Sequence, residues 1–126
     1  MKDRFRFRAW DKSFRRMIYN IFFFWKENTI TVYELHKDAS KSYLPNSHIV
    51  LEQCTGAKDM NGKLIYEGDI VKFYEYNYEV YFNENTSAMD IWNEKKEVGH
   101  SLYYHEKFEV IGNIHENPEL LGEQSK

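Results

Sequence analysis

Short runs in which hydrophobic and polar residues alternate dominate the chain. In residues 4–10, basic and apolar side chains alternate strictly, which places them on opposite faces of an extended segment. The basic positions are Arg4, Arg6 and Arg8. This pattern predicts a half-buried strand. The turn composition of residues 11–13, followed by a second extended pattern from Met17, predicts that the strand opens a hairpin.

Further extended segments follow, separated by turn residues. We expect strands over residues 21–25, 29–35, 48–54, 64–66, 68–74, 78–82, 88–92 and 108–115. Residues 36–47 show no period and contain Pro45, so a loop is expected there. The charged residues 93–105 fit either a loop or a helical turn.

Local signals also mark turns and one helix. Asn61-Gly62 predicts a tight type I′ hairpin turn, because both residues tolerate the positive φ that this turn requires. Gly112 interrupts a strand pattern and suggests a bulge or a close backbone approach. Asn117-Pro118-Glu119 offers an N-cap, a proline at the first helical position and an acid in the first turn, which predicts a short terminal helix.

These elements predict a mainly β protein. No pair of long amphipathic helices and no alternation of strands with helices is present in the sequence. Several short strands with turns between them suggest a small barrel or a curled sheet, particularly after residue 50.

Composition adds a constraint on where the aromatic side chains lie. The 126 residues fit one compact domain, or a small domain with a substantial appendage, and they include 9 Phe, 10 Tyr and 3 Trp. Each ring offers roughly 150–250 Å² of burial, so a core, an interface or both must take them up. Cys54 is the single cysteine, which excludes an internal disulfide and a thiol-based zinc site and suggests a reducing cytoplasm. Neither a signal peptide nor a membrane span is expected.

Charge is distributed unevenly along the chain. The net charge is -3, yet residues 1–16 carry seven basic and two acidic side chains and contain every arginine of the protein. These arginines are the candidate contacts for a partner or for nucleic-acid phosphates: Arg4, Arg6, Arg8, Arg15 and Arg16. The alternative is a strand face paired with acidic neighbours of the same or an adjacent subunit. The acidic remainder of the chain favours this alternative.

Motifs of common enzymes are missing from the sequence. It contains no phosphate-binding loop, no dinucleotide-binding glycine pattern and no nucleophile elbow. The five histidines lack metal-ligand spacing, and the many carboxylates carry no acid–base signature. We therefore expect no catalytic residues, no cofactor and no metal, and a protein that is not an enzyme.

Three segments in order resemble the YopX-like family of bacteriophage and prophage proteins. They are Phe5–Asp11, Thr55–Val71 and Val110–Leu121, with Arg6 replacing the usual lysine of the first. The resemblance implies a mostly β, oligomeric protein encoded on phage DNA in bacteria, whose C-terminal part is an SH3-like barrel. It implies no known activity and no catalytic residues.

The resemblance and the residue patterns together suggest two regions. We expect an N-terminal β region over residues 1–50 and an SH3-like barrel with a short C-terminal helix over residues 51–126. Structural turns or bulges are expected at Gly56, Asn61, Gly62, Gly68 and Gly112. The barrel interior is expected to contain Ile65, Val71, Phe73, Val110 and Ile111.

The expected function is that of a cytoplasmic accessory protein in the bacterial host. It would self-associate as a homo-oligomer and bind a host or phage protein, with no membrane contact. Nucleic-acid binding through the arginine-rich strand is the alternative, which the net negative charge disfavours.

Overall fold

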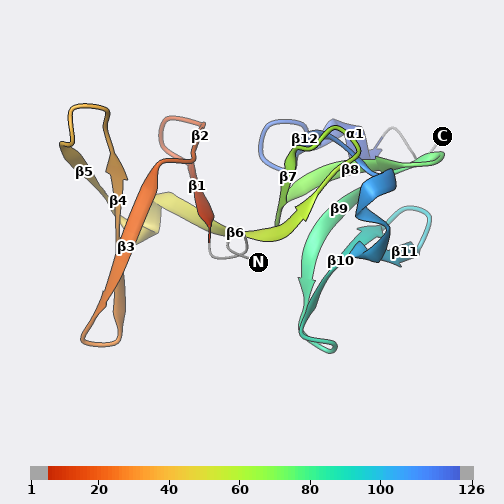
Figure 1. The fold of residues 1–126 in the computed structure, drawn as a ribbon, viewed down its shortest axis with the longest axis horizontal. Helices are drawn as coiled ribbons and strands as arrows, with labels where there is room; N and C mark the ends of the chain where they lie inside the picture. The colour runs from red at the N-terminus through yellow and green to blue at the C-terminus, as the bar shows by residue number, and fades with distance from the viewer. Residues whose placement is uncertain (1–5, 123–126) are drawn as a thin grey trace. The chain divides into compact units, whose positions relative to one another are not determined.

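The computed structural model describes residues 6–122, whose regular secondary structure is mostly β-strand (Figure 1). They divide into two compact units, Arg6–Gln53 and the described residues from Cys54 onward. Strand β6 (Ile49–Lys58) runs from the first unit into the second, pairing with β1 in its first half and with β7 in its second half. We call the two parts the N-terminal unit and the C-terminal unit.

The N-terminal unit opens with the hairpin that the alternation predicts. Strand β1 (Phe7–Asp11) pairs antiparallel with β2 (Arg16–Ile18) on one side and with β6 on the other. The carboxylate of Asp11 accepts hydrogen bonds from the backbone N–H groups of Ser13 and Phe14, at 2.9 and 3.2 Å. This local capping fixes the turn between β1 and β2.

A three-stranded antiparallel sheet completes this unit. It consists of β3 (Ile21–Lys26), β4 (Thr29–Leu35) and β5 (Lys41–Leu44), with β4 in the centre. The expected loop over residues 36–47 is therefore wrong in part, because it contains β5. Four residues are too few to show a period, and β5 is defined by its pairing with β4, in which Tyr43 lies opposite Tyr33.

The inner face of this sheet and the β1–β2 hairpin share a hydrophobic core of aliphatic side chains. Its buried members are Ala9, Ile18, Val32, Leu44 and Ile49. Phe23 packs against this cluster and meets Phe7 edge to face, with ring centroids 5.0 Å apart. The core of the N-terminal unit is thus largely aliphatic.

The C-terminal unit is built on a curled five-stranded sheet that forms half of a barrel (Figure 1). In spatial order its strands are β11 (Val98–Ser101), β10 (Ala88–Asn93), β9 (Tyr76–Asn83), β8 (Asp69–Phe73) and β12 (Glu109–Asn113). Strand β7 (Leu64–Tyr66) pairs with β6, and a short helix α1 (Glu119–Gly122) follows β12. The predicted mainly β class and terminal helix are confirmed.

The core of the curled sheet contains large rings. Its buried residues are Ile65, Val71, Phe73, Tyr78, Val80, Ile91 and Phe108. Val110 packs against this cluster as expected, whereas Ile111 is only partly buried and is not among its members.

The turns of this unit partly follow the sequence expectation. Gly56, Gly62 and Gly68 adopt positive φ, at 85°, 82° and 89°. The expected type I′ turn is wrong, because Asn61 keeps a negative φ and the reversal includes more residues. Asp59 closes the loop instead. Its backbone N–H donates to the Lys63 carbonyl at 2.8 Å, and its side chain accepts from the loop's own N–H groups.

The strand irregularity at Gly112 and the segment over residues 93–105 are the remaining features with an expectation from the sequence. Strand register shifts between Val110 and Gly112, so the predicted bulge is present. A Cβ at Gly112 would lie 2.5 Å from the Asn117 side-chain oxygen, so the close approach is also real. In the segment left open between loop and helical turn, the structure places β11 and then a 3-10 helix, η3 (Leu102–Lys107).

Candidate functional site

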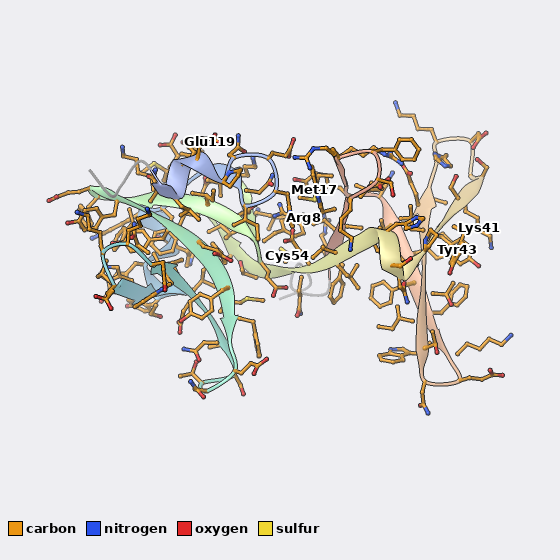
Figure 2. The ribbon with its side chains drawn as sticks, turned by 180° about the vertical axis from the view of Figure 1, so that it is seen from behind. Arg8, Met17, Lys41, Tyr43, Cys54 and Glu119 are labelled. Atoms are coloured by element: carbon orange, nitrogen blue, oxygen red, sulfur yellow. The ribbon has the colours of Figure 1, made fainter. Side chains whose placement is uncertain are left out.

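The arginines singled out in the sequence lie in different environments. Arg4 lies outside the described residues, and Arg6 is exposed. Arg8 is buried in β1 (Figure 2), where its Nε donates to the Glu52 carboxylate at 2.9 Å. Arg15 sits at the hairpin turn with its guanidinium 5.7 Å from the centre of the Trp10 ring.

Arg16 is engaged by acids of its own unit. Its guanidinium binds the Glu34 carboxylate through two hydrogen bonds, at 2.7 and 3.1 Å, and lies 3.6 Å from Asp11. The hydrogen bond with Arg16 lowers the pKa of Glu34, and the bond with Glu34 raises the pKa of Arg16. Arg8 and Arg16 therefore both form ion pairs with acidic side chains of the N-terminal unit.

The outer face of the three-stranded sheet carries a row of rings in contact with one another. Cross-strand register places Phe22 opposite Tyr33 and Tyr33 opposite Tyr43, and Phe24 lies two residues beyond Phe22 on the same face. Neighbouring ring centroids in this row are 5.5 to 6.1 Å apart. We call Phe22, Phe24, Tyr33 and Tyr43 the aromatic ladder.

The aromatic ladder is open to solvent within its unit. Phe24 is 46% exposed and Tyr43 is 59% exposed, and Leu35 adds apolar surface beside them. The Lys41 ammonium lies 5.0 Å from the Tyr33 ring centre and 5.9 Å from that of Phe22; Lys41 and Tyr43 both lie on β5 (Figure 2). Such a surface offers large contact area at little conformational cost, which suits an interface.

A hollow of about 310 Å³ lies between β2, β4 and β5 of the same unit. It contains the Arg16–Glu34 ion pair and the His36 ring, whose Nε2 lies 2.7 Å from the Ser42 hydroxyl. A histidine beside a serine hydroxyl is a geometry of activated nucleophiles. Here both side chains lie at the surface, and the hydrogen bond is exposed.

The C-terminal unit contains an aromatic pocket of about 370 Å³, next to its core. Strands β8, β9 and β11 and the 3-10 helix η3 supply its walls. The lining residues are Phe73, Tyr74, Glu75, Tyr76, Tyr78, Val98, His100, Tyr104 and Lys107. We call this cavity the aromatic pocket.

Ring packing gives the aromatic pocket a preformed floor. The Phe73 ring contacts His100 edge to face at 5.0 Å and stacks on Tyr104 at 5.9 Å. Tyr78 lies 5.5 Å from His100. Burial raises the pKa of the Tyr78 phenol, and the nearby Tyr76 and Glu75 raise it further, so this phenol remains neutral at physiological pH.

Sequence reasoning did not identify either aromatic surface as a site. The run of apolar residues from Ile21 to Trp25 predicts a strand and nothing more. The aromatic ladder depends on the register of three strands, and the aromatic pocket depends on η3 folding back onto β8. Neither relation has a local sequence signal.

Two searches of residues 6–122 found nothing. No cluster of three or more His, Cys, Asp or Glu side chains in this range is arranged to hold a metal ion. No helix within it has the length and apolar character needed to cross a membrane.

Comparison with known proteins places the chain in a family. The family model described as YopX protein matches residues 6–122. The chain belongs to the YopX protein family. No functionally curated protein matches its sequence.

Two solved structures resemble this member of the YopX family over nearly its whole length. Protein yopX from Bacillus subtilis is 25% identical, with a TM-score of 0.65, and the match covers 93% of this chain and 98% of that one. Protein EF1440 from Enterococcus faecalis is 27% identical, with a TM-score of 0.62, and the match covers 92% and 96%. These likenesses support the fold and name no activity.

Proposed function

We propose that this YopX family member is a phage- or prophage-encoded accessory protein of the bacterial cytoplasm that acts by binding rather than by catalysis. It self-associates through the aromatic ladder and binds a macromolecular partner, a host or phage protein. The observation that carries this proposal is the exposed row of contacting rings on the β3–β4–β5 sheet. Exposed apolar surface of this kind marks interaction sites on folded proteins.

A second copy of the chain is the occupant that fits the aromatic ladder. The ladder is flanked by the outer edges of β3 and β5, which have no further strand beside them within the three-stranded sheet. Open edges are liabilities that assembly covers. A two-fold arrangement would place the same rings of two copies against each other.

Nucleic-acid binding through the arginines is less well supported. Arg8 is buried against Glu52, and Arg16 is held by Glu34, so phosphate contact at either would require breaking an ion pair. The C-terminal unit adds repulsion, since residues 54–122 contain thirteen acidic and six basic side chains.

Sedimentation of the full chain tests self-association. We expect a concentration-dependent mass above that of one chain at micromolar concentration, and a monomer for Tyr43→Lys and for Phe24→Lys. Tyr103→Lys is the matched control, because Tyr103 is 82% exposed and lies in the other unit. A wild-type monomer over the whole range contradicts the proposal, as does an oligomer unaffected by both ladder variants.

A covalent probe tests the absence of catalysis. The His36–Ser42 pair is the arrangement in the described residues that most resembles a nucleophile with its base. We expect a fluorophosphonate to leave Ser42 unlabelled, because the hydrogen bond between His36 and Ser42 is exposed to solvent. Stoichiometric labelling that disappears in Ser42→Ala would contradict the proposal and identify a hydrolase.

A further inference from the structure

The aromatic pocket combines a rigid apolar floor with a polar rim. Phe73 and Tyr78 form the floor and are 5% and 2% exposed, so the core holds them in place. Tyr74 and Tyr104 at the rim are largely exposed. The phenol oxygens and the His100 ring add hydrogen-bonding groups around this floor. A ligand that fits here has a flat, weakly hydrated group that also hydrogen bonds.

The aromatic pocket has one acidic and one basic side chain in its lining and lies in a strongly acidic unit. Glu75 lines it, and its carboxylate is close enough to raise the pKa of the Tyr78 phenol in addition to the effects of burial and Tyr76. Residues 54–122 carry a net charge of -7, from thirteen acidic and six basic side chains. Lys107 is the cation among the lining residues, and it is exposed at the rim.

We propose that the aromatic pocket binds an arginine side chain from an extended, basic segment of a partner protein. This inference rests on the proposed function as a binding protein and specifies the chemistry of its partner. A guanidinium is planar and weakly hydrated, so it stacks on the ring faces while its N–H groups pair with the Glu75 carboxylate. The fork of five donors also reaches the surrounding phenol oxygens.

The same region already engages a cation within the chain. The Lys96 ammonium lies 5.6 Å from the centre of the Tyr76 ring, a ring that also lines the aromatic pocket. One ring of the lining therefore already lies beside a positive group of the chain itself. A nucleotide would also stack on the rings, but its phosphates would enter the field of a unit with net charge -7.

Three matched peptides test the ligand chemistry. The probes are a short peptide of Arg-Gly-Gly repeats, the same peptide with lysine in place of arginine, and the same peptide with citrulline, which is isosteric but neutral. Each peptide is titrated into the full chain at low ionic strength in a calorimeter. The affinity should be highest for the arginine peptide, lower for the lysine peptide and lowest for the citrulline peptide. We expect about a tenfold loss from arginine to citrulline, the size of a cation–π and ion-pair contribution.

Variants in the lining locate the bound peptide. Glu75→Gln and Tyr104→Ala should each weaken binding of the arginine peptide by about fivefold to tenfold. Their controls, Glu84→Gln and Phe82→Ala, remove an exposed acid and an exposed ring outside the lining and should change nothing. Lys107→Gln should strengthen binding, because it removes like charge from the rim. For an anionic ligand its effect would have the opposite sign.

Several results would overturn this inference. Equal affinity for the arginine and lysine peptides, or equal weakening by Glu75→Gln and Glu84→Gln, would show general attraction to an acidic surface. Tighter binding of adenosine monophosphate than of the arginine peptide would assign the aromatic pocket to nucleotides.

Sedimentation of the same samples separates this test from self-association. An oligomer with no peptide binding contradicts the arginine site alone, and a monomer that binds the peptide contradicts the aromatic ladder interface alone.

Discussion

The core clusters of the two units differ in their aromatic content. In the N-terminal unit, the buried core cluster is aliphatic, Trp10 is buried elsewhere in the unit, and the aromatic ladder lies on the outside of the sheet. In the C-terminal unit, Phe73, Tyr78 and Phe108 lie inside the curled sheet. The charges differ as well, since residues 6–53 carry +3 and residues 54–122 carry -7. The rings of the C-terminal core stabilise that unit from within, whereas the rings of the aromatic ladder remain exposed apolar surface.

The largest expected effect concerns the buried ion pair of the N-terminal unit. Glu52→Ala leaves the Arg8 guanidinium buried without its carboxylate, and we expect a loss of about 3–5 kcal/mol in unfolding free energy. Urea unfolding, with hydrogen-exchange mass spectrometry to read each unit separately, measures it. The joint change Arg8→Met with Glu52→Leu is the control and should restore most of the stability. A single variant as stable as the wild type would show that solvent reaches Arg8.

The second effect concerns backbone geometry in the C-terminal unit. Gly68 has φ of 89°, and its backbone N–H and C=O groups bond to Val80 and Ile114, both at 2.9 Å. Gly68→Val forces a β-branched residue into this conformation and should cost about 1–3 kcal/mol. Gly122→Ala is the matched control, because a Cβ there meets no atom within 4 Å. An unchanged urea midpoint for Gly68→Val would contradict this account.

The sequence predicted much of the fold because its strands are individually recognisable. Strict alternation identified the opening strand, and the β-branched pattern identified residues 29–35. Glycine identified the positive φ at Gly68 and the bulge at Gly112 without knowledge of the partner strand. These features are local, so one sequence is enough to find them.

The missing parts depend on contacts between distant segments. Strand β5 is defined by β4, and the turn around Asn61 is controlled by the Asp59 side chain, which also bonds to Val110 on β12. Alternation placed Arg8 on an exposed face, whereas pairing of β1 with both β2 and β6 buries it beside Glu52. Both aromatic surfaces follow from contacts of this kind, so no local pattern of residues predicts the candidate sites.

A third prediction uses pH to probe the C-terminal unit. Burial raises the pKa of Asp59, but hydrogen bonds from the N–H groups of Val110, Lys63 and Asn61 outweigh burial and leave it below its ordinary value. A lowered folded pKa stabilises the fold above the ordinary aspartate pKa of about 3.9, and this stabilisation is lost as pH falls through the folded value. Asp59→Asn should cost about 1–3 kcal/mol at neutral pH and flatten the acid dependence. An acid profile identical to that of the wild type would contradict this role.

A fourth prediction sharpens the contrast in assembly. If copies associate through the aromatic ladder, a tenfold rise in protein concentration should stabilise the N-terminal unit by up to about 1.4 kcal/mol. The C-terminal unit should respond less. Hydrogen exchange at two concentrations measures both units in one sample, and Tyr43→Lys is the control that should abolish the dependence. Equal dependence in the two units would place the self-association interface elsewhere.

The smallest expected effect is that of the Arg16–Glu34 pair. The two hydrogen bonds are well formed, but the Arg16 side chain is 48% exposed, so solvent screens the pair and its contribution should be about 0.2–1 kcal/mol. Because the folded pKa of Glu34 is lowered, chiefly by its bond with Arg16, this contribution is present above the ordinary glutamate pKa and disappears as pH falls through the folded value. Arg16 stays charged throughout.

Salt tests this contribution. Glu34→Gln should lower the free energy of unfolding slightly in dilute buffer. It should have almost no effect in 1 M salt, where the Debye screening length is about 3 Å. The Arg8–Glu52 pair is buried and should keep its effect in the same salt, and a salt response shared by both pairs would show that burial does not separate them.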